Sequence, residues 1–150
     1  EAANVMSWFA GYGGDLALNY EDQVTLGDLT YCRVGRSDWN TMDELRGYLK
    51  QLFSDEIVDP LLSTGCFIET ENGLYALPAG RGSDVTKGGV VLSVVRSPET
   101  PALCLVRAEV ELLEWADGAV EPTVTGTQVY QFPYQKVGDK WVFTQFEAIF

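Results

Sequence analysis

The stretch Phe67–Pro78, FIETENGLYALP, sets Asn72 and Gly73 between two runs that alternate apolar and polar residues. Asn-Gly is the pair that a two-residue hairpin turn favours, because both positions need a backbone conformation that these residues tolerate. We therefore predict an antiparallel hairpin that turns at Asn72 and Gly73. The expected opposed pairs are Glu71 with Leu74, Thr70 with Tyr75, and Ile68 with Leu77. The shared face of Ile68, Tyr75 and Leu77 is expected to pack on helices.

A capped helix precedes this hairpin. In TMDELRGYLKQLFS (41–54), Thr41 and Glu44 have the spacing of a capping box, in which each side chain accepts a hydrogen bond from a backbone amide at the helix start. The residues of its predicted apolar face recur at helical spacing. They are Leu45, Tyr48, Leu49, Leu52 and Phe53.

A second short helix is predicted directly after the first. Ser54 has the residue type of an N-cap, and Asp55 with Glu56 would lie in the first turn, where negative charge is favourable. Pro60 is expected to kink or end this helix, because proline lacks the amide hydrogen that a helix interior uses.

The first forty residues carry one more helix signal and one strand signal. Apolar residues at helical spacing predict a short helix that glycines end. The apolar residues are Val5, Trp8, Phe9 and Tyr12, and the glycines are Gly11, Gly13 and Gly14. The stretch VTLGDLTYCRV (24–34) is rich in β-branched and aromatic residues, so we predict a strand that is bulged at Gly27.

After the hairpin, the period of the pattern stays at two, which is typical of strands. The expected strands are VVLSVV (90–95), ALCLVRAEVELLEW (102–115), GTQVYQFPYQKV (126–137) and KWVFTQFEAIF (140–150). Gly138 and Asp139 suit a tight turn between the last two. Helices followed by a meandering antiparallel sheet predict an α+β fold, and we expect residues 1–150 to form one domain.

The charge of the chain limits its partners. Of 150 residues, 22 are acidic and 10 are basic, which gives a net charge of −12. This charge disfavours nucleic acid and anionic membranes and favours a basic protein surface or divalent cations. The simpler interpretation is that the charge keeps the surface soluble. No apolar run approaches the length of a membrane span, so we expect no transmembrane segment.

The residue types exclude the commonest catalytic sites. Histidine is absent, so a Ser-His-Asp or Cys-His arrangement cannot form, and most catalytic zinc sites lose their usual ligand. Cys32, Cys66 and Cys104 lie far apart in apolar runs, where a free cysteine is a small buried hydrophobe, although one disulfide is possible. We expect no catalytic residue, no metal site and no cofactor.

The order of these elements resembles a known family. The capped helix MDELRGYLKQLFS, the short acidic helix, ETENGLYALP and the closing VGDKWVFTQF resemble the IseA-type inhibitors of the D,L-endopeptidases that cut cell-wall peptidoglycan in Gram-positive bacteria. The resemblance covers residues 41–146, and more loosely it extends to cystatin-like and NTF2-like folds. It implies helices packed on a curved antiparallel sheet, and an exported, non-enzymatic protein that occludes the cleft of a wall hydrolase.

Acidic residues at helix starts and in loops are the candidates for binding a basic partner. Their simpler role is to cap helices and keep turns soluble. The candidate partner-binding residues are Asp55, Glu56, Glu69, Glu71 and Asp84.

An NTF2-like domain with an aromatic ligand pocket is the alternative hypothesis. Tyr130 and Tyr134 lie on one strand face, and Asp28 or Glu109 could serve as a base beside a tyrosine. This interpretation rests on fold analogy. Glu109 and Glu111 share a strand face with Arg107, which predicts a solvated sheet face instead.

We therefore predict an exported, monomeric binding module that is secreted or lipid-anchored at the cell surface. The chain begins at Glu1 without an initiator methionine, which allows for a leader that has been removed. The expected partner is a basic protein surface, and the resemblance to the inhibitor family implies that this partner is a wall hydrolase.

Overall fold

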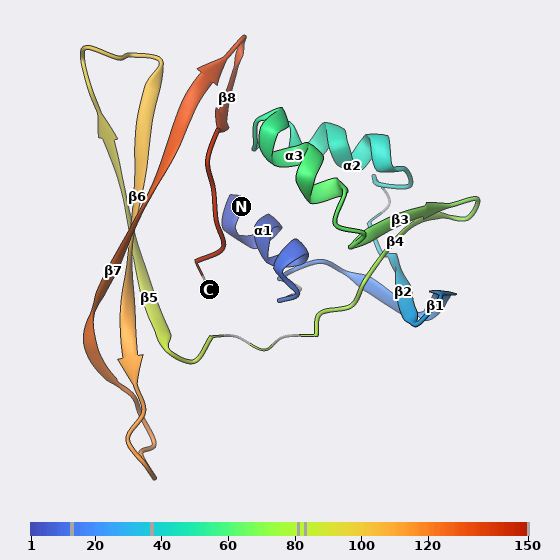
Figure 1. The fold of residues 1–150 in the computed structure, drawn as a ribbon, viewed down its shortest axis with the longest axis horizontal. Helices are drawn as coiled ribbons and strands as arrows, with labels where there is room; N and C mark the ends of the chain where they lie inside the picture. The colour runs from blue at the N-terminus through green and yellow to red at the C-terminus, as the bar shows by residue number, and fades with distance from the viewer. Residues whose placement is uncertain (13, 37, 81, 83, 150) are drawn as a thin grey trace. The chain divides into compact units, whose positions relative to one another are not determined.

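The computed structural model describes residues 1–12, 14–36, 38–80, 82 and 84–149. These residues form three helices and two antiparallel four-stranded sheets, so the fold class is α+β, as predicted. The chain divides into two compact units, Glu1–Gly82 (unit 1) and Ser83–Phe150 (unit 2). Figure 1 shows the three helices with the strands β1 to β4 of unit 1 and the long strands of unit 2. The single domain expected from the sequence stays a prediction.

Helix α1 (Ala2–Ala10) confirms the helix predicted near the N-terminus. Val5 and Trp8 are buried along its apolar face. The helix ends at Gly11, whose φ of 84° is the left-handed conformation that glycine adopts without strain. The backbone amide of Tyr12 then donates to the Ser7 carbonyl at 3.0 Å. Of the three glycines expected at this end, Gly13 lies outside the described residues.

Helix α2 (Met42–Leu49) begins with the predicted capping box. The Glu44 amide donates to Thr41 Oγ1 at 3.2 Å, and Glu44 Oε2 accepts from the Thr41 amide at 3.0 Å and from the Asn40 amide at 2.7 Å. Leu45 and Leu49 are fully buried, which confirms this part of the predicted apolar face, but the helix ends at Leu49, so Leu52 and Phe53 lie beyond it. The capping box at the start of α2 is therefore formed by neighbouring residues of the chain, as the sequence predicted.

Protonation of Glu44 is expected to destabilise unit 1 in acid. Hydrogen bonds from the backbone amides of Asn40 and Thr41 lower the pKa of this carboxyl below its ordinary value of 4.5. Because the folded-state pKa is lowered, the stabilisation is fully present above the unfolded value and is lost as pH falls through the folded value. The measurement is the free energy of unfolding of the wild type and of Glu44→Gln between about pH 7 and about pH 3. The difference between them should shrink below pH 4.5; a difference that does not change with pH would contradict this role.

Helix α3 (Asp55–Leu62) follows at once, with Asp55 and Glu56 in its first turn as predicted. Ser54 holds the N-cap position, but its hydroxyl makes no capping hydrogen bond. Pro60 lies inside the helix, which ends two residues later, so it sits in the last turn. Proline has no amide hydrogen for the hydrogen bonds of a helix interior, which is consistent with a helix that ends soon after it.

The first sheet contains strands β1 (Leu18–Leu26), β2 (Leu29–Val34), β3 (Phe67–Thr70) and β4 (Gly73–Ala76), in the order β1-β2-β4-β3. The prediction of one bulged strand over 24–34 was wrong, because this stretch is a hairpin in which Leu26 pairs with Leu29. Gly27, with φ of 59°, supplies the turn conformation that the bulge had been expected to need.

The hairpin of β3 and β4 forms as predicted, but its turn is shifted by one residue. Thr70 pairs with Gly73, so Glu71 and Asn72 form the loop and Gly73 opens β4. The Asn72 amide donates to Thr70 Oγ1 at 3.1 Å, and this hydroxyl donates to the Gly73 carbonyl at 3.3 Å. The pairs observed further along the hairpin are Glu69 with Leu74, Ile68 with Tyr75, and Phe67 with Ala76.

The face of this hairpin that meets the helices is also the opposite of the one expected. The rings of Phe67 and Phe9 of α1 are 5.2 Å apart, and Glu69 Oε2 accepts from the Met42 amide at the start of α2 at 2.7 Å. Alternate residues of a strand point to opposite faces. Ile68 and its partner Tyr75 therefore point away from the helices.

The structure has two sheets where the sequence predicted one. Strand β4 pairs with β2, with Cys32 opposite Ala76 and Arg33 opposite Tyr75. The hairpin is thereby joined to the strands before the helices and not to those that follow it. A hairpin of alternating residues fixes its own pairing but leaves its outer edge open to any strand, so the sequence pattern did not decide between these arrangements.

The second sheet is a meander of β5 (Lys87–Arg96), β6 (Leu103–Glu114), β7 (Thr123–Val137) and β8 (Lys140–Phe143), which pair in chain order (Figure 1). Gly138 and Asp139 form the predicted turn, with Val137 opposite Lys140. The last strand ends at Phe143, earlier than expected, and Phe150 lies outside the described residues.

Aromatic side chains fill one face of the second sheet. Phe132 stacks on Phe146 with ring centroids 4.3 Å apart, and Tyr134 lies 4.8 Å from Phe143. The Thr144 amide donates to the Pro133 carbonyl at 3.1 Å, so the segment after β8 stays attached to β7. The buried residues of this face are Cys104, Ala108, Val110, Tyr130 and Phe132. The aromatic residues of β7 thus belong to a core.

Candidate functional site

Strand β1 is interrupted by a bulge at the edge of the first sheet. Asn19 pairs with Arg33 and Gln23 pairs with Cys32, so residues 20–22 have no partner in β2. Bulges of this kind bend an edge strand and redirect its side chains, and they are frequent beside functional sites. The bulge places Asp22 against a group of polar side chains from β2 and β4.

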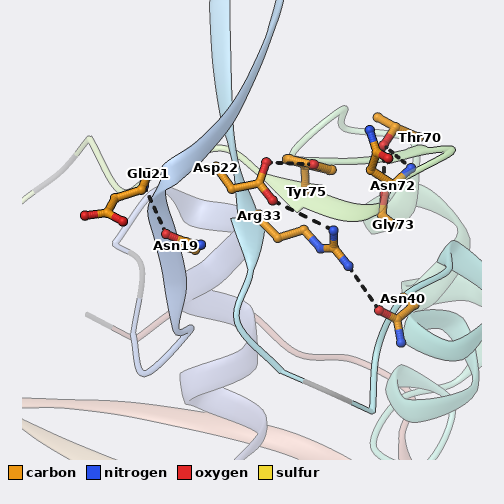
Figure 2. A network of polar contacts seen from close by, with 9 residues as sticks. All are labelled: Asn19, Glu21, Asp22, Arg33, Asn40, Thr70, Asn72, Gly73 and Tyr75. Carbon is orange, nitrogen blue, oxygen red and sulfur yellow. Dashed lines mark hydrogen bonds and ion pairs between the residues drawn. The ribbon is translucent and has the colours of Figure 1, made fainter.

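We call Asp22, Arg33 and Tyr75 the bulge cluster (Figure 2). The Tyr75 hydroxyl donates to Asp22 Oδ1 at 2.9 Å, and Arg33 Nη1 lies 3.9 Å from Asp22 Oδ2. The guanidinium carbon of Arg33 is 5.6 Å from the centre of the Tyr75 ring. Its Nη2 also donates to Asn40 Oδ1 at 3.3 Å, so Arg33 reaches between Asp22 and Asn40. These contacts anchor the bulge from two strands.

The bulge cluster has a buried ring and partly exposed charges. Tyr75 is only 1% exposed, whereas the side chain of Arg33 is 27% exposed and that of Asp22 is 42% exposed. An ion pair at this exposure contributes little stability, because water screens it. The hydrogen bond from the tyrosine to the carboxylate is the stronger contact, since one partner is ionised.

Gly73 leaves the space that Arg33 occupies. A Cβ atom at residue 73 would lie 2.7 Å from Arg33 Nη2 and 2.9 Å from its Cζ. The φ of Gly73 is 124°, a conformation that other residues rarely adopt. The shifted hairpin turn and the position of Arg33 therefore depend on the same glycine.

The outer side of the bulge is exposed. Tyr20 is 62% exposed, which is unusual for an aromatic residue in a strand. The backbone amide of its neighbour Glu21 donates to Asn19 Oδ1 at 3.0 Å, which holds the turn of the bulge (Figure 2). Within the described residues, the Glu21 carboxylate has no hydrogen bond or ion pair. The bulge cluster thus uses its polar groups in contacts within unit 1, while the neighbouring Tyr20 side chain is exposed and the Glu21 backbone is held by Asn19.

The negative charge is concentrated in unit 1. Its 82 residues include thirteen acidic and five basic side chains, a net charge of −8, whereas unit 2 has nine and five, a net charge of −4. Many carboxylates of unit 1 bond to their own chain. Arg46 pairs with Asp59, and Arg36 pairs with Asp38. The hydrogen bond from the Arg36 guanidinium lowers the pKa of the Asp38 carboxyl.

Most of the predicted partner-binding acids have local contacts. Asp55 pairs with Lys50 at 3.0 Å, and Glu69 accepts from the Met42 amide. Hydrogen bonds from the Thr86 hydroxyl, and to a smaller extent from the Thr86 amide, lower the pKa of Asp84. The pKa of Glu56 is lowered mainly by a hydrogen bond from its own backbone amide. Glu71 is exposed in the β3–β4 loop. Among these five, the Glu71 carboxylate is the one without a local contact in the part of the chain that the structure describes.

Within unit 2, the carboxylate and the tyrosines of the alternative ligand pocket are not brought together. In the second sheet Ala108 pairs with Tyr130 and Glu109 pairs with Val129, so Glu109 lies on the face opposite Tyr130. Glu109 forms an ion pair with Arg107 on the sheet face that the sequence predicted to be solvated. Asp28 lies in the exposed turn between β1 and β2 of unit 1.

The two pocket tyrosines have other partners in unit 2. The Tyr130 hydroxyl accepts from Lys87 Nζ at 3.1 Å, and the ring of Tyr134 lies 5.6 Å from that of Trp141. Both tyrosines therefore take part in the packing of the sheet face that also carries Phe132.

A second cluster in unit 1 was not foreseen from the sequence. The rings of Trp8, Trp39 and Tyr48 lie 4.6 to 6.2 Å apart, and the Arg36 guanidinium lies 4.0 Å from the Trp39 ring. Burial, and next the hydrogen bond to Glu1, raise the pKa of Tyr48 to about 12. This cluster holds Arg36 and Trp39, which lie between β2 and α2. The sequence had placed Trp8 and Tyr48 on apolar helix faces, but no pattern linked them to Trp39.

The bulge cluster was also missed. Its one signal is the polar run Glu21-Asp22-Gln23, which breaks the alternation of β1. Such a run is equally typical of a loop, and the partners Arg33 and Tyr75 lie in other strands. No spacing rule links residues of separate strands.

Comparison with models of known protein families finds no match for this chain, and comparison with curated proteins finds none either. None of the described helices combines the length and apolar character that a membrane span needs.

Proposed function

We propose that this protein is a non-catalytic, extracytoplasmic binding module, and that unit 1 binds a basic surface of a partner protein. The observation that carries the proposal is the bulge of β1, which presents Tyr20 and Glu21 on a frame fixed by Asp22, Arg33 and Tyr75. An exposed aromatic residue on a rigid frame is the usual centre of a protein interface, because little conformational entropy is lost when it is buried.

The charge of unit 1 supports a basic partner. A net charge of −8 attracts a basic surface over a distance of about one Debye length, roughly 8 Å at physiological salt. Such attraction raises the association rate more than the final affinity. Glu21 and Glu71 can meet the partner directly, since neither carboxylate is committed to a contact within the described residues.

A cell-wall D,L-endopeptidase is the proposed partner. Three of the four elements that resemble the IseA-type inhibitors, α2, α3 and the β3–β4 hairpin, lie in the same unit as the bulge, and the closing stretch 137–146 lies in unit 2. The absence of histidine supports a binding role over hydrolysis by a Ser-His or Cys-His site. In this proposal the acidic unit enters the basic cleft of the hydrolase and blocks its substrate.

The double variant Glu21→Gln, Glu71→Gln is expected to weaken inhibition of a purified D,L-endopeptidase. We expect the inhibition constant to rise about tenfold at low salt, mostly through slower association, and the effect to fade at about 0.5 M salt. Tyr20→Ala should raise it by about tenfold or more at both salts, because the lost contact is apolar. The measurement is the rate of peptide cleavage at increasing inhibitor concentration.

The matched control is Glu114→Gln, Glu121→Gln, which removes the same charge from unit 2. It should leave the inhibition constant almost unchanged. Equal losses in both double variants would show that net charge alone acts, and the bulge would then have no special role. A wild-type protein that neither binds nor inhibits the endopeptidase at low salt would refute the proposed partner.

A further inference from the structure

Strand β5 forms an edge of the second sheet, because it pairs with β6 and with no other strand among the described residues. Beside Lys87, the pairing is interrupted by a bulge at Gly88 and Gly89. The Gly89 amide donates to Glu111 Oε2 at 3.0 Å, which satisfies the backbone there. The straight part of the edge therefore runs from Val90 to Arg96.

This edge is apolar on both of its faces. Its four exposed apolar side chains are each between 52% and 67% exposed, and alternate residues point to opposite faces. They are Val91, Leu92, Val94 and Val95. A long apolar edge is usually protected by an inward charge or a proline, because its free amides and carbonyls can pair with another strand. Residues 90–95 contain neither.

We propose that β5 pairs with β5 of a second copy of this chain, antiparallel and about a two-fold axis at Ser93. About a two-fold axis, odd-numbered residues lie opposite odd-numbered residues of the other copy, and even-numbered opposite even-numbered. An axis at Ser93 sets Val91 opposite Val95 and Leu92 opposite Val94 of the other copy. All four exposed apolar residues then find an apolar partner. An axis moved by one residue to Leu92 would set Val91 opposite Ser93 and lose this match.

The charges around β5 also fit a second copy. Residues 85–98 contain no acidic residue, and Lys87 and Arg96 are their two basic residues. Two chains with a net charge of −12 repel one another, and this repulsion is reduced at β5, because the strand has no carboxylate and those of the neighbouring strand, Glu109 and Glu111, bond to Arg107 and to the Gly89 amide. The paired edge is uncharged from Val90 to Val95, so cross-strand contacts form without burying a charge. The result would be one continuous sheet of eight strands, four from each copy.

The first test is the mass of the full chain in solution by sedimentation equilibrium from about 1 to about 100 μM, a range that brackets a micromolar dimer. The wild type should approach twice its mass of 16.6 kDa. Leu92→Lys, Val94→Lys should raise the dissociation constant about tenfold or more, because one apolar cross-strand pair on each side of the axis is lost and two lysines meet in its place. Both side chains are exposed, so this variant should remain folded.

The matched control is Val120→Lys, Val137→Lys, which adds the same charge at two exposed valines outside β5. It should dimerise almost as the wild type does. A wild type that stays monomeric at the highest concentration would overturn the proposal, and so would equal weakening in both variants. Assembly that continues beyond two copies, or a monomer that instead binds an extended peptide of another sequence, would also overturn it.

A cysteine variant tests the register separately. With the axis at Ser93, Ser93→Cys sets two thiols directly opposite, about 5 Å apart between Cβ atoms, which a disulfide can join with a small adjustment. Val91→Cys sets its two thiols four residues apart along the strands, about 13 Å, which is too far. Under mild oxidation Ser93→Cys should cross-link several-fold faster than Val91→Cys. Equal rates would refute this register, and the wild type reports the background from Cys32, Cys66 and Cys104.

The sequence predicted a monomer, and a monomer and this dimer exclude one another. The proposed binding of a basic partner by unit 1 uses other residues, so each proposal can fail without the other. The inhibition assay changes Tyr20, Glu21 and Glu71, whereas the mass and cross-linking measurements change residues of β5.

Discussion

Replacing Gly73 by alanine is expected to lower the free energy of unfolding by about 2 kcal/mol. The φ of 124° at this residue strains any side chain, and the new Cβ would lie 2.7 Å from Arg33 Nη2. Arg33 is flexible, so it can move aside, but it then loses its contacts with Asp22 and Asn40. The measurement is equilibrium unfolding in urea, followed by circular dichroism.

Two variants separate the causes of this loss. Gly47 lies in α2, and a Cβ there would meet nothing within 4 Å, so Gly47→Ala should raise stability by about 0.5 to 1 kcal/mol. In an Arg33→Ala background the clash is absent, and Gly73→Ala should cost only the backbone strain. The same loss in both backgrounds would mean that the clash between the new Cβ and Arg33 contributes nothing to it. A stable Gly73→Ala protein would contradict the observed turn.

Phe132→Ala is expected to cost about 3 to 5 kcal/mol, the range for truncating a buried aromatic residue. Phe132 is buried and contacts Phe146 and Tyr130, so the deletion leaves a cavity that the sheet cannot close. Thermal unfolding followed by tyrosine and tryptophan signals would measure this loss. The result shows whether the aromatic face is a packed core or lines a ligand pocket. Removing a side chain that lines an open pocket changes the free energy of unfolding little, whereas removing one from a packed core lowers it strongly.

Val129→Ala is the matched control in the same strand. Val129 points to the other face of β7, opposite Glu109, and is partly exposed. Its truncation should cost less than about 1 kcal/mol. Similar losses for the two variants would mean that the faces of β7 are not distinguished by burial. A loss below about 1 kcal/mol for Phe132→Ala would restore the pocket hypothesis.

The candidate site was less predictable than the helices. The capping box of α2 joins Thr41 to Glu44, three residues apart, and short-range spacing was enough to find it. Asp22 and Tyr75 are 53 residues apart, and Arg33 joins them from a third strand. Their contact depends on which strands pair and on where β1 is bulged. Hydrophobic alternation does not encode either choice.

The sequence alone determined the starts of α2 and α3, the existence of the β3–β4 and β7–β8 hairpins and the exclusion of histidine chemistry, because these depend on residue type and on contacts between near neighbours in the chain. The tertiary structure decided the turn at Glu71 and Asn72, the pairing of β4 with β2, and the face to which Tyr75 points. A hairpin can shift by one residue at small local cost, so contacts from outside choose its register. Here Arg33 of β2, which pairs with Tyr75, and the start of α2, which bonds Glu69, make those contacts.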